Sequence, residues 1–266
     1  MSTSEAPPIP ATETRVTRPP LPPVARMFYP FATVLLFVVM FWGFHRFYLH
    51  GQAYPGRPLT PPIKTLVIIH GVSMTLWMVL LVAQPILIAA KNRKLHMTLG
   101  KIGAGLAAII VICGVAIGIG AARVNPPDLK IDGMLPKPFL TVPLFSILFF
   151  GAFVAVGVYF RKRPEIHRAM MLIATLSAIP AAVDRIDTIT RLYPTPVVSP
   201  LFTVFGPFTG GLMIGGILVV LRCAITRSFD KWLVGAFGAL VVLDAVTIQI
   251  SKTAAWDAIA TALTGK

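Results

Sequence analysis

Long apolar runs alternate with short polar breaks along almost the whole chain. Runs of about 20 residues, the length at which a helix crosses the core of a bilayer, recur about seven times. Each run is apolar on every side and lacks the alternating polar positions of a membrane barrel strand. The pattern therefore predicts an all-α, polytopic membrane helical bundle of about seven transmembrane helices. The runs extend approximately over residues 28–49, 63–90, 96–122, 139–160, 167–186, 200–221 and 232–250.

Small residues inside the runs indicate close helix packing. Gly and Ala recur in "GKIGAGLAAIIVICGVAIGIGAA" and "GPFTGGLMIGGILVV", and such residues let helices approach one another in lipid. Pro180 and the segment "YPTPVVSP" interrupt the fifth and sixth runs, so we expect these two spans to be shortened or broken. We divide the chain into a disordered, Pro-rich cytoplasmic tail (1–26), the transmembrane bundle (27–252) and a short C-terminal tail (253–266).

The composition supports a membrane location, and the charges give an orientation. Hydrophobic residues make up 56% of the 266 positions and charged residues only 13%, whereas soluble proteins carry about 25% charged residues. Basic residues gather before the first run and in the breaks "KNRK", "RKRPEIHR" and "RCAITRSFDK". By the positive-inside rule these segments face the cytoplasm, which places the N-terminus inside. We expect a multi-pass protein of the inner (cytoplasmic) membrane.

The net charge of +14 is explained by contact with anionic lipids of the bilayer. Nucleic acid is excluded as a partner because no basic stripe with interleaved aromatic residues occurs outside the short breaks. No P-loop, GxSxG or HExxH motif is present, so a kinase or hydrolase is not expected. Cysteines do not form a CxxC or CxxCH pattern, which excludes covalently attached haem and thiolate metal sites.

The five histidines all lie near the ends of the runs and form two layers. His96 and His167 begin the third and fifth runs at the inner side, whereas His45, His50 and His70 lie at the outer side. Paired imidazoles at one depth on neighbouring helices are what axial ligation of a b-type haem needs, with Arg or Lys nearby for the propionates. The sequence predicts that His96 faces His167.

Two haem sites follow from these layers, and other interpretations stay open. The inner pair has Arg93 and Arg168 beside it, and the outer pair would join His70 to His45. A second hypothesis places copper at His70, Met74 and His45, because residues four apart share a helix face. The alternative for each histidine is a headgroup contact or a helix-start residue, with no cofactor bound.

Polar residues inside the runs are a third indication of function. Gln84, Asp184, Arg185 and Asp244 lie within apolar segments, and buried ionisable groups in lipid are normally paired or functional. One interpretation is an ion pair between Arg185 and Asp244 that holds two helices together. The other is a pathway for protons or substrate, or a set of contacts to a quinone head.

A resemblance supports the architecture. The strings "HGVSMTLWMVLLVAQPILIAAKNRKLHMTLGKIG" and "RKRPEIHRAMMLIATLSAIPAAVDRI" resemble an uncharacterised family of predicted bacterial multi-span membrane proteins with an H…LHxxLG…HRxMM pattern. The chain is also loosely similar to two-haem transmembrane cytochrome b reductases, which pair histidines from four successive helices. In this chain the fourth and sixth spans carry no histidine, so one haem site would need a histidine of the first span. The residues that match the family pattern are His70, His96, Gly100, His167, Arg168 and Arg185.

Three functions remain after these exclusions. The first is a haem-binding electron-transfer protein or respiratory-chain subunit, with a quinone or another redox partner and, if it is an enzyme, membrane oxidoreductase activity. The second is a transporter of small solutes that is coupled to protons. The third is a structural or assembly protein without a cofactor, and an oligomer is compatible with all three.

Overall fold

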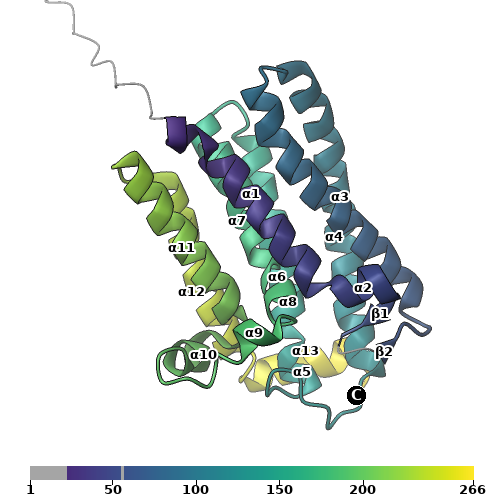
Figure 1. The fold of residues 1–266 in the computed structure, drawn as a ribbon. Coiled ribbons are helices and arrows are strands. Elements are labelled where there is room, and N and C mark those ends of the chain that lie inside the picture. Colours follow the sequence, from purple (N-terminus) through teal and green to yellow (C-terminus); the bar gives the residue numbers. More distant parts are fainter. Residues whose placement is uncertain (1–22, 55–56) are drawn as a thin grey trace, which may run out of the picture.

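The computed structural model describes residues 23–54 and 57–266, and these form an almost entirely helical bundle (Figure 1). A 3-10 turn, η1 (Gly206–Phe208), and a small antiparallel pair of strands, β1 (Gln52–Ala53) and β2 (Arg57–Pro58), are the other regular elements of this part of the chain. The helices are α1 (Pro23–Gly43), α2 (His45–His50), α3 (Lys64–Ala89), α4 (Arg93–Val124), α5 (Pro136–Phe139), α6 (Thr141–Tyr159), α7 (Pro164–Ala178), α8 (Pro180–Val183), α9 (Asp187–Thr190), α10 (Ser199–Phe205), α11 (Thr209–Thr226), α12 (Lys231–Ile250) and α13 (Ala254–Thr264).

Six helical segments in the described part are long and apolar enough to cross a membrane. They correspond to α1, α3, α4, α5 with α6, α10 with α11, and α12. Large apolar side chains such as Ile112, Ile217 and Val220 point outward along them and are more than 60% exposed. An apolar outer surface of this kind suits lipid rather than water. The chain is therefore a multi-pass membrane protein, as the hydropathy pattern predicts.

Helices α7 and α8 lie where the fifth run predicts a span, and they are not among the six described segments that are long and apolar enough to cross a membrane. The fifth apolar run predicts one continuous helix over 167–186, but α7 ends at Ala178 and α8 begins at Pro180. Proline has no N–H to donate and fits the first turn of a helix, so it starts a new helix here. With 15 residues α7 is short, and nine of them are buried. It lies between α6, α1, α11 and α12 at the centre of the bundle.

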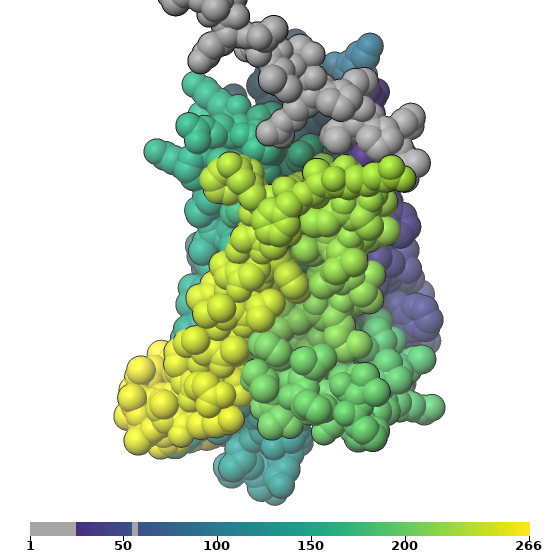
Figure 2. Space-filling view, turned by 90° about the vertical axis from the view of Figure 1, so that its left-hand side faces the viewer, coloured from purple at the N-terminus to yellow at the C-terminus, as the bar shows by residue number. Residues whose placement is uncertain are grey.

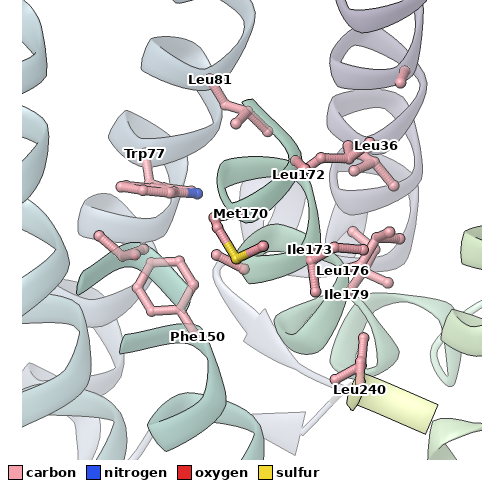
Figure 3. Close-up of a cluster of buried hydrophobic side chains, with 14 of the residues drawn as sticks. Leu36, Trp77, Leu81, Phe150, Met170, Leu172, Ile173, Leu176, Ile179 and Leu240 are labelled. Atoms are coloured by element: carbon pink, nitrogen blue, oxygen red, sulfur yellow. The ribbon is translucent and has the colours of Figure 1, made fainter. Parts of the chain in front are cut away.

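Aromatic and aliphatic side chains of several helices pack around α7 (Figure 3). The Trp77 indole of α3 and the Phe150 ring of α6 meet edge to face, with centroids 4.9 Å apart, and both lie beside Met170. The indole N–H of Trp77 donates to Thr175 Oγ1 of α7 over 3.1 Å. Helix α6 packs closely against α7 at Gly157, because a Cβ at this position would lie 2.3 Å from Met171 Cε of α7.

We call the two ends of the bundle the basic face and the opposite face. The basic face is the upper end in Figure 1, where α1 begins and where α3 joins α4, α6 joins α7 and α11 joins α12. These connections carry the sequences "KNRK", "RKRPEIHR" and "RCAITRSFDK". The opposite face carries the short elements α2, α5, α8, α9 and α10, the two strands and α13.

The bundle differs from the sequence prediction at three boundaries. Helix α1 already begins at Pro23, so 23–26 belong to the bundle, and the rest of the predicted tail lies outside the described residues. The first run breaks at Gly43, where a Cβ would clash with the Ala182 carbonyl of α8. The predicted C-terminal tail is instead the helix α13, whose Trp256 is buried and donates from Nε1 to the Lys137 carbonyl over 2.8 Å. Figure 2 shows α13 as the yellow element at the lower end of the bundle.

Candidate functional site: an imidazole pair at the basic face

His96 and His167 occupy equivalent positions in two helices that start at the basic face. Each is the fourth residue of its helix, α4 or α7. The start of α4 is fixed by Asn92, whose side-chain oxygen accepts from Leu95 N over 3.1 Å, and such N-caps satisfy a free backbone donor. The start of α7 is fixed by Pro164 at the first helical position. Both imidazoles therefore lie about one turn below the same surface.

The two rings meet, as the sequence predicts. Their centroids are 6.3 Å apart and their planes are inclined by 83°. The Nδ1 of His167 lies 2.8 Å from the Gly157 carbonyl oxygen of α6, and because a carbonyl only accepts, Nδ1 carries the proton. The His167 Nε2 then has a free lone pair. The His96 Nδ1 is buried and has no hydrogen-bond partner in the described part of the chain.

Gln84 of α3 adds a second unsatisfied polar group beside His96. Its Oε1 is buried without a partner among the described residues, and its Nε2 lies 3.9 Å from the position that a Cβ would occupy at Gly100, one turn beyond His96. A buried polar atom without a hydrogen bond costs about 1–3 kcal/mol, so such atoms are rare and call for a ligand or an ordered water. Two of them in one wall make this region the candidate site.

The two arginines predicted beside the pair lie on different sides. Arg93 opens α4 at the surface, and its charge acts on the His96 ring. Arg168 follows His167 in sequence, but its guanidinium lies over the Tyr29 ring of α1, with Cζ 5.1 Å from the ring centroid. Successive residues of a helix point in directions about 100° apart, so His167 and Arg168 serve different neighbours.

The outer histidines are not brought together. His45 Nδ1 lies 2.7 Å from the Trp42 carbonyl of its own segment, while His70 points between α3 and α4, with Cε1 3.2 Å from the position of a Cβ at Gly114. Among the described residues no ring contact joins the two, and no group of three or more His, Cys, Asp or Glu side chains gathers. The structure therefore gives no support to a second haem or a copper site in the outer layer.

The structure gives no support to the predicted ion pair between Arg185 and Asp244. Asp244 is 2% exposed in the middle of α12, and its Oδ1 has no partner in the described part of the molecule. The Arg185 guanidinium instead lies over the Phe44 ring, with Cζ 4.8 Å from the centroid, and donates to the Ala181 carbonyl. The ion pair stays a prediction; the contacts with Phe44 and Ala181 place Arg185 just after the break between α7 and α8, at the opposite face.

Asp184, the neighbour of Arg185, also has a partner at the opposite face. It accepts a hydrogen bond of 2.7 Å from the Tyr193 hydroxyl. Burial raises the pKa of the Tyr193 phenol, and the Asp184 carboxyl raises this pKa further. Burial also raises the pKa of the Asp184 carboxyl. The Tyr193 hydroxyl thus donates to Asp184 in a partly buried pair at the opposite face.

A cluster around Tyr29 was not anticipated from the sequence. Arg222 of α11 is 3% exposed, and its Nη1 donates to the Ala25 carbonyl over 2.9 Å. Its Nε lies 3.4 Å from Asp230 Oδ2, and its Cζ is 5.4 Å from the Tyr29 ring centroid. The available signal was an arginine directly after the sixth run, eight positions before an aspartate in the same break.

Comparison of the chain with models of protein families, with curated proteins and with solved structures finds no match.

Proposed function

We propose that this protein is an electron-transfer protein of the inner membrane that holds a b-type haem between His96 and His167. The observation that carries the proposal is the 6.3 Å separation of the two ring centroids. Two imidazoles that were to hold one iron between them would need to lie this close together, and His96 and His167 would be the residues to hold it.

The donor set fits the iron of a haem. The hydrogen bond from His167 Nδ1 to Gly157 fixes the orientation of the ring and leaves Nε2 for the metal, which is how protein carbonyls commonly orient a ligating histidine. His96 brings a buried Nδ1 that has no hydrogen bond in the described part of the chain. When bound, haem would supply a one-electron iron couple, and Arg93 at the surface would face a propionate. A quinone or a redox protein at the basic face would exchange the electron.

The test is an absorbance spectrum of the detergent-purified protein, oxidised and then reduced with dithionite, together with pyridine haemochrome quantitation. We expect a Soret band, a reduced α band and one haem per chain. His96→Ala and His167→Ala should each abolish the α band. The matched control is His50→Ala, because His50 is an exposed histidine at the opposite face. A folded wild-type protein that is colourless after reconstitution with haemin would refute the proposal.

A second candidate function, proton-coupled transport of a small solute, rests on Asp244. The Asp244 carboxyl is 2% exposed, and its Oδ1 has no partner among the described residues. An anion in such a place is costly in lipid. Release of a proton from Asp244 would therefore be coupled to a rearrangement of the helices around it. Proton flux into proteoliposomes measures this. Asp244→Asn should abolish the flux while Asp257→Asn, which alters an exposed carboxyl at the opposite face, should not.

A further inference from the structure

Three side chains from three helices meet around the Tyr29 ring near the basic face. Tyr29 comes from α1, Arg168 from α7 and Arg222 from α11. The guanidinium carbons lie 5.1 Å (Arg168) and 5.4 Å (Arg222) from the centroid of the ring. Two guanidinium groups against one ring place two positive charges in a small region, and arginine does not lose its proton in proteins.

Among the described residues, one carboxylate faces these two cations. Asp230 at the start of α12 pairs with Arg222 over 3.4 Å, and the Ala25 carbonyl accepts a further hydrogen bond from Arg222. Arg222 thus has two partners, one of them charged. By contrast, the Nε of Arg168 and the hydroxyl of Tyr29 are buried and accept or donate no hydrogen bond of normal geometry among the described residues, and the Arg168 guanidinium lies close enough to the Tyr29 hydroxyl to interact with it. Within the described part of the chain, the charge of Arg168 therefore has no anionic partner.

We propose that Tyr29 and Arg168 form a binding site for a phosphate oxyanion, with Arg222 and Asp230 as its rigid back wall. Guanidinium groups bind phosphate through paired hydrogen bonds, and a hydroxyl adds a third donor. The site lies at the end of the helices, where the headgroups of one leaflet would be, and basic pockets between transmembrane helices at this depth bind anionic headgroups. A lipid headgroup and free phosphate share this chemistry, and the test separates them.

The site is separate from the imidazole pair. His167 turns to Gly157 and His96, whereas Arg168 turns to α1. Lipid binding can therefore succeed or fail independently of haem binding.

The experiment measures thermal unfolding and native mass spectra of the full chain in neutral detergent with added phosphatidylglycerol, phosphatidylcholine or inorganic phosphate. We expect phosphatidylglycerol to raise the unfolding temperature and to remain bound, while phosphatidylcholine does neither. Arg168→Gln should weaken phosphatidylglycerol binding about tenfold, because it removes a hydrogen bond from a charged donor. Tyr29→Phe should weaken it about threefold, because a hydrogen bond from a neutral donor contributes less. The control is Arg161→Gln, an exposed arginine of the same face.

Each outcome has a defined meaning. Stabilisation by inorganic phosphate that disappears in Arg168→Gln, without a preference for phosphatidylglycerol, would support the oxyanion site and identify a soluble ligand. The proposal would be overturned if the wild type, Arg168→Gln and Arg161→Gln all bound phosphatidylglycerol equally well and all bound inorganic phosphate equally well. Arg168→Lys keeps the charge without the planar fork, so partial binding by this variant would provide the same test if Arg168→Gln does not fold.

Discussion

The imidazoles of His96 and His167 meet edge to face, although 71 positions separate them in the chain. The contact arises because α4 and α7 both start at the basic face and each places a histidine in its fourth position. It also depends on the packing of α6 against α7, since the Gly157 carbonyl of α6 holds the His167 ring. The geometry of the pair is thus coupled to the fit between these two helices.

Gly157→Ala should destabilise the protein and displace His167. The new Cβ would lie 2.3 Å from Met171 Cε and 3.1 Å from Met170 Cβ, and overpacking of this kind costs about 1–3 kcal/mol. Thermal unfolding in detergent measures the loss. Gly105→Ala is the matched control, because a Cβ at Gly105 meets no atom within 4 Å. Equal stability of the two variants would show that α6 and α7 do not pack as described.

Thr175→Val should destabilise the centre of the bundle without changing its volume. The substitution removes the acceptor of the Trp77 indole N–H, which is 3.1 Å away and buried, and an unsatisfied buried donor costs about 1–3 kcal/mol. Equilibrium unfolding followed by tryptophan fluorescence measures this. Thr98→Val removes an exposed hydroxyl that contacts only the Lys94 carbonyl, so its unfolding curve should match that of the wild type.

Asp230→Asn should cost much more than Asp257→Asn. Asp230 pairs with Arg222, whose side chain is 3% exposed, whereas Asp257 pairs with the partly exposed Lys137 over 3.6 Å. Removal of one partner from a buried ion pair costs about 3–5 kcal/mol, and an exposed pair contributes at most about 1 kcal/mol. Asp230 also accepts from Leu233 N at the start of α12. Comparison of the two unfolding temperatures in one detergent tests this difference.

Trp256→Ala should release α13 from the bundle. Trp256 is 6% exposed and packs with Leu140, Leu144 and Ala122, and loss of a buried tryptophan costs about 3–5 kcal/mol. Limited proteolysis should then remove the C-terminal segment from the variant and leave the remaining chain intact. Trp232→Ala, at a tryptophan that is 37% exposed, should leave the cleavage pattern unchanged.

Much of this structure is predictable because the bilayer imposes a simple rule on length and hydropathy. Six predicted runs correspond to six long apolar helical segments. The depth of His96 and His167 follows from their places near helix starts, so their contact is also predictable. The weak fifth run is visible in advance from Pro180, which begins α8.

The remaining features depend on packing, which the hydropathy pattern does not contain. Helix α13 is a short amphipathic segment, and its position depends on contacts with Lys137 and with α4. The contacts of Arg185 with Phe44 and Ala181 depend on the helix break that precedes it. The Tyr29 cluster joins residues from three distant segments. Such tertiary contacts have no local signal in the sequence. An arginine at the end of an apolar run, such as Arg222, indicates only that a partner is needed.

The shortness of α7 has a consequence for how the protein is made. Fifteen residues of helix rise about 22 Å, less than the roughly 30 Å of a bilayer core, and the segment contains Glu165, His167 and Arg168. On leaving the ribosome such a segment partitions poorly into lipid by itself, because charged residues oppose insertion. It would therefore enter the membrane as the partner of α6 and reach its place only when α11 and α12 have been synthesised and close around it. Chains that stop before α11 should expose α7 to quality-control proteases.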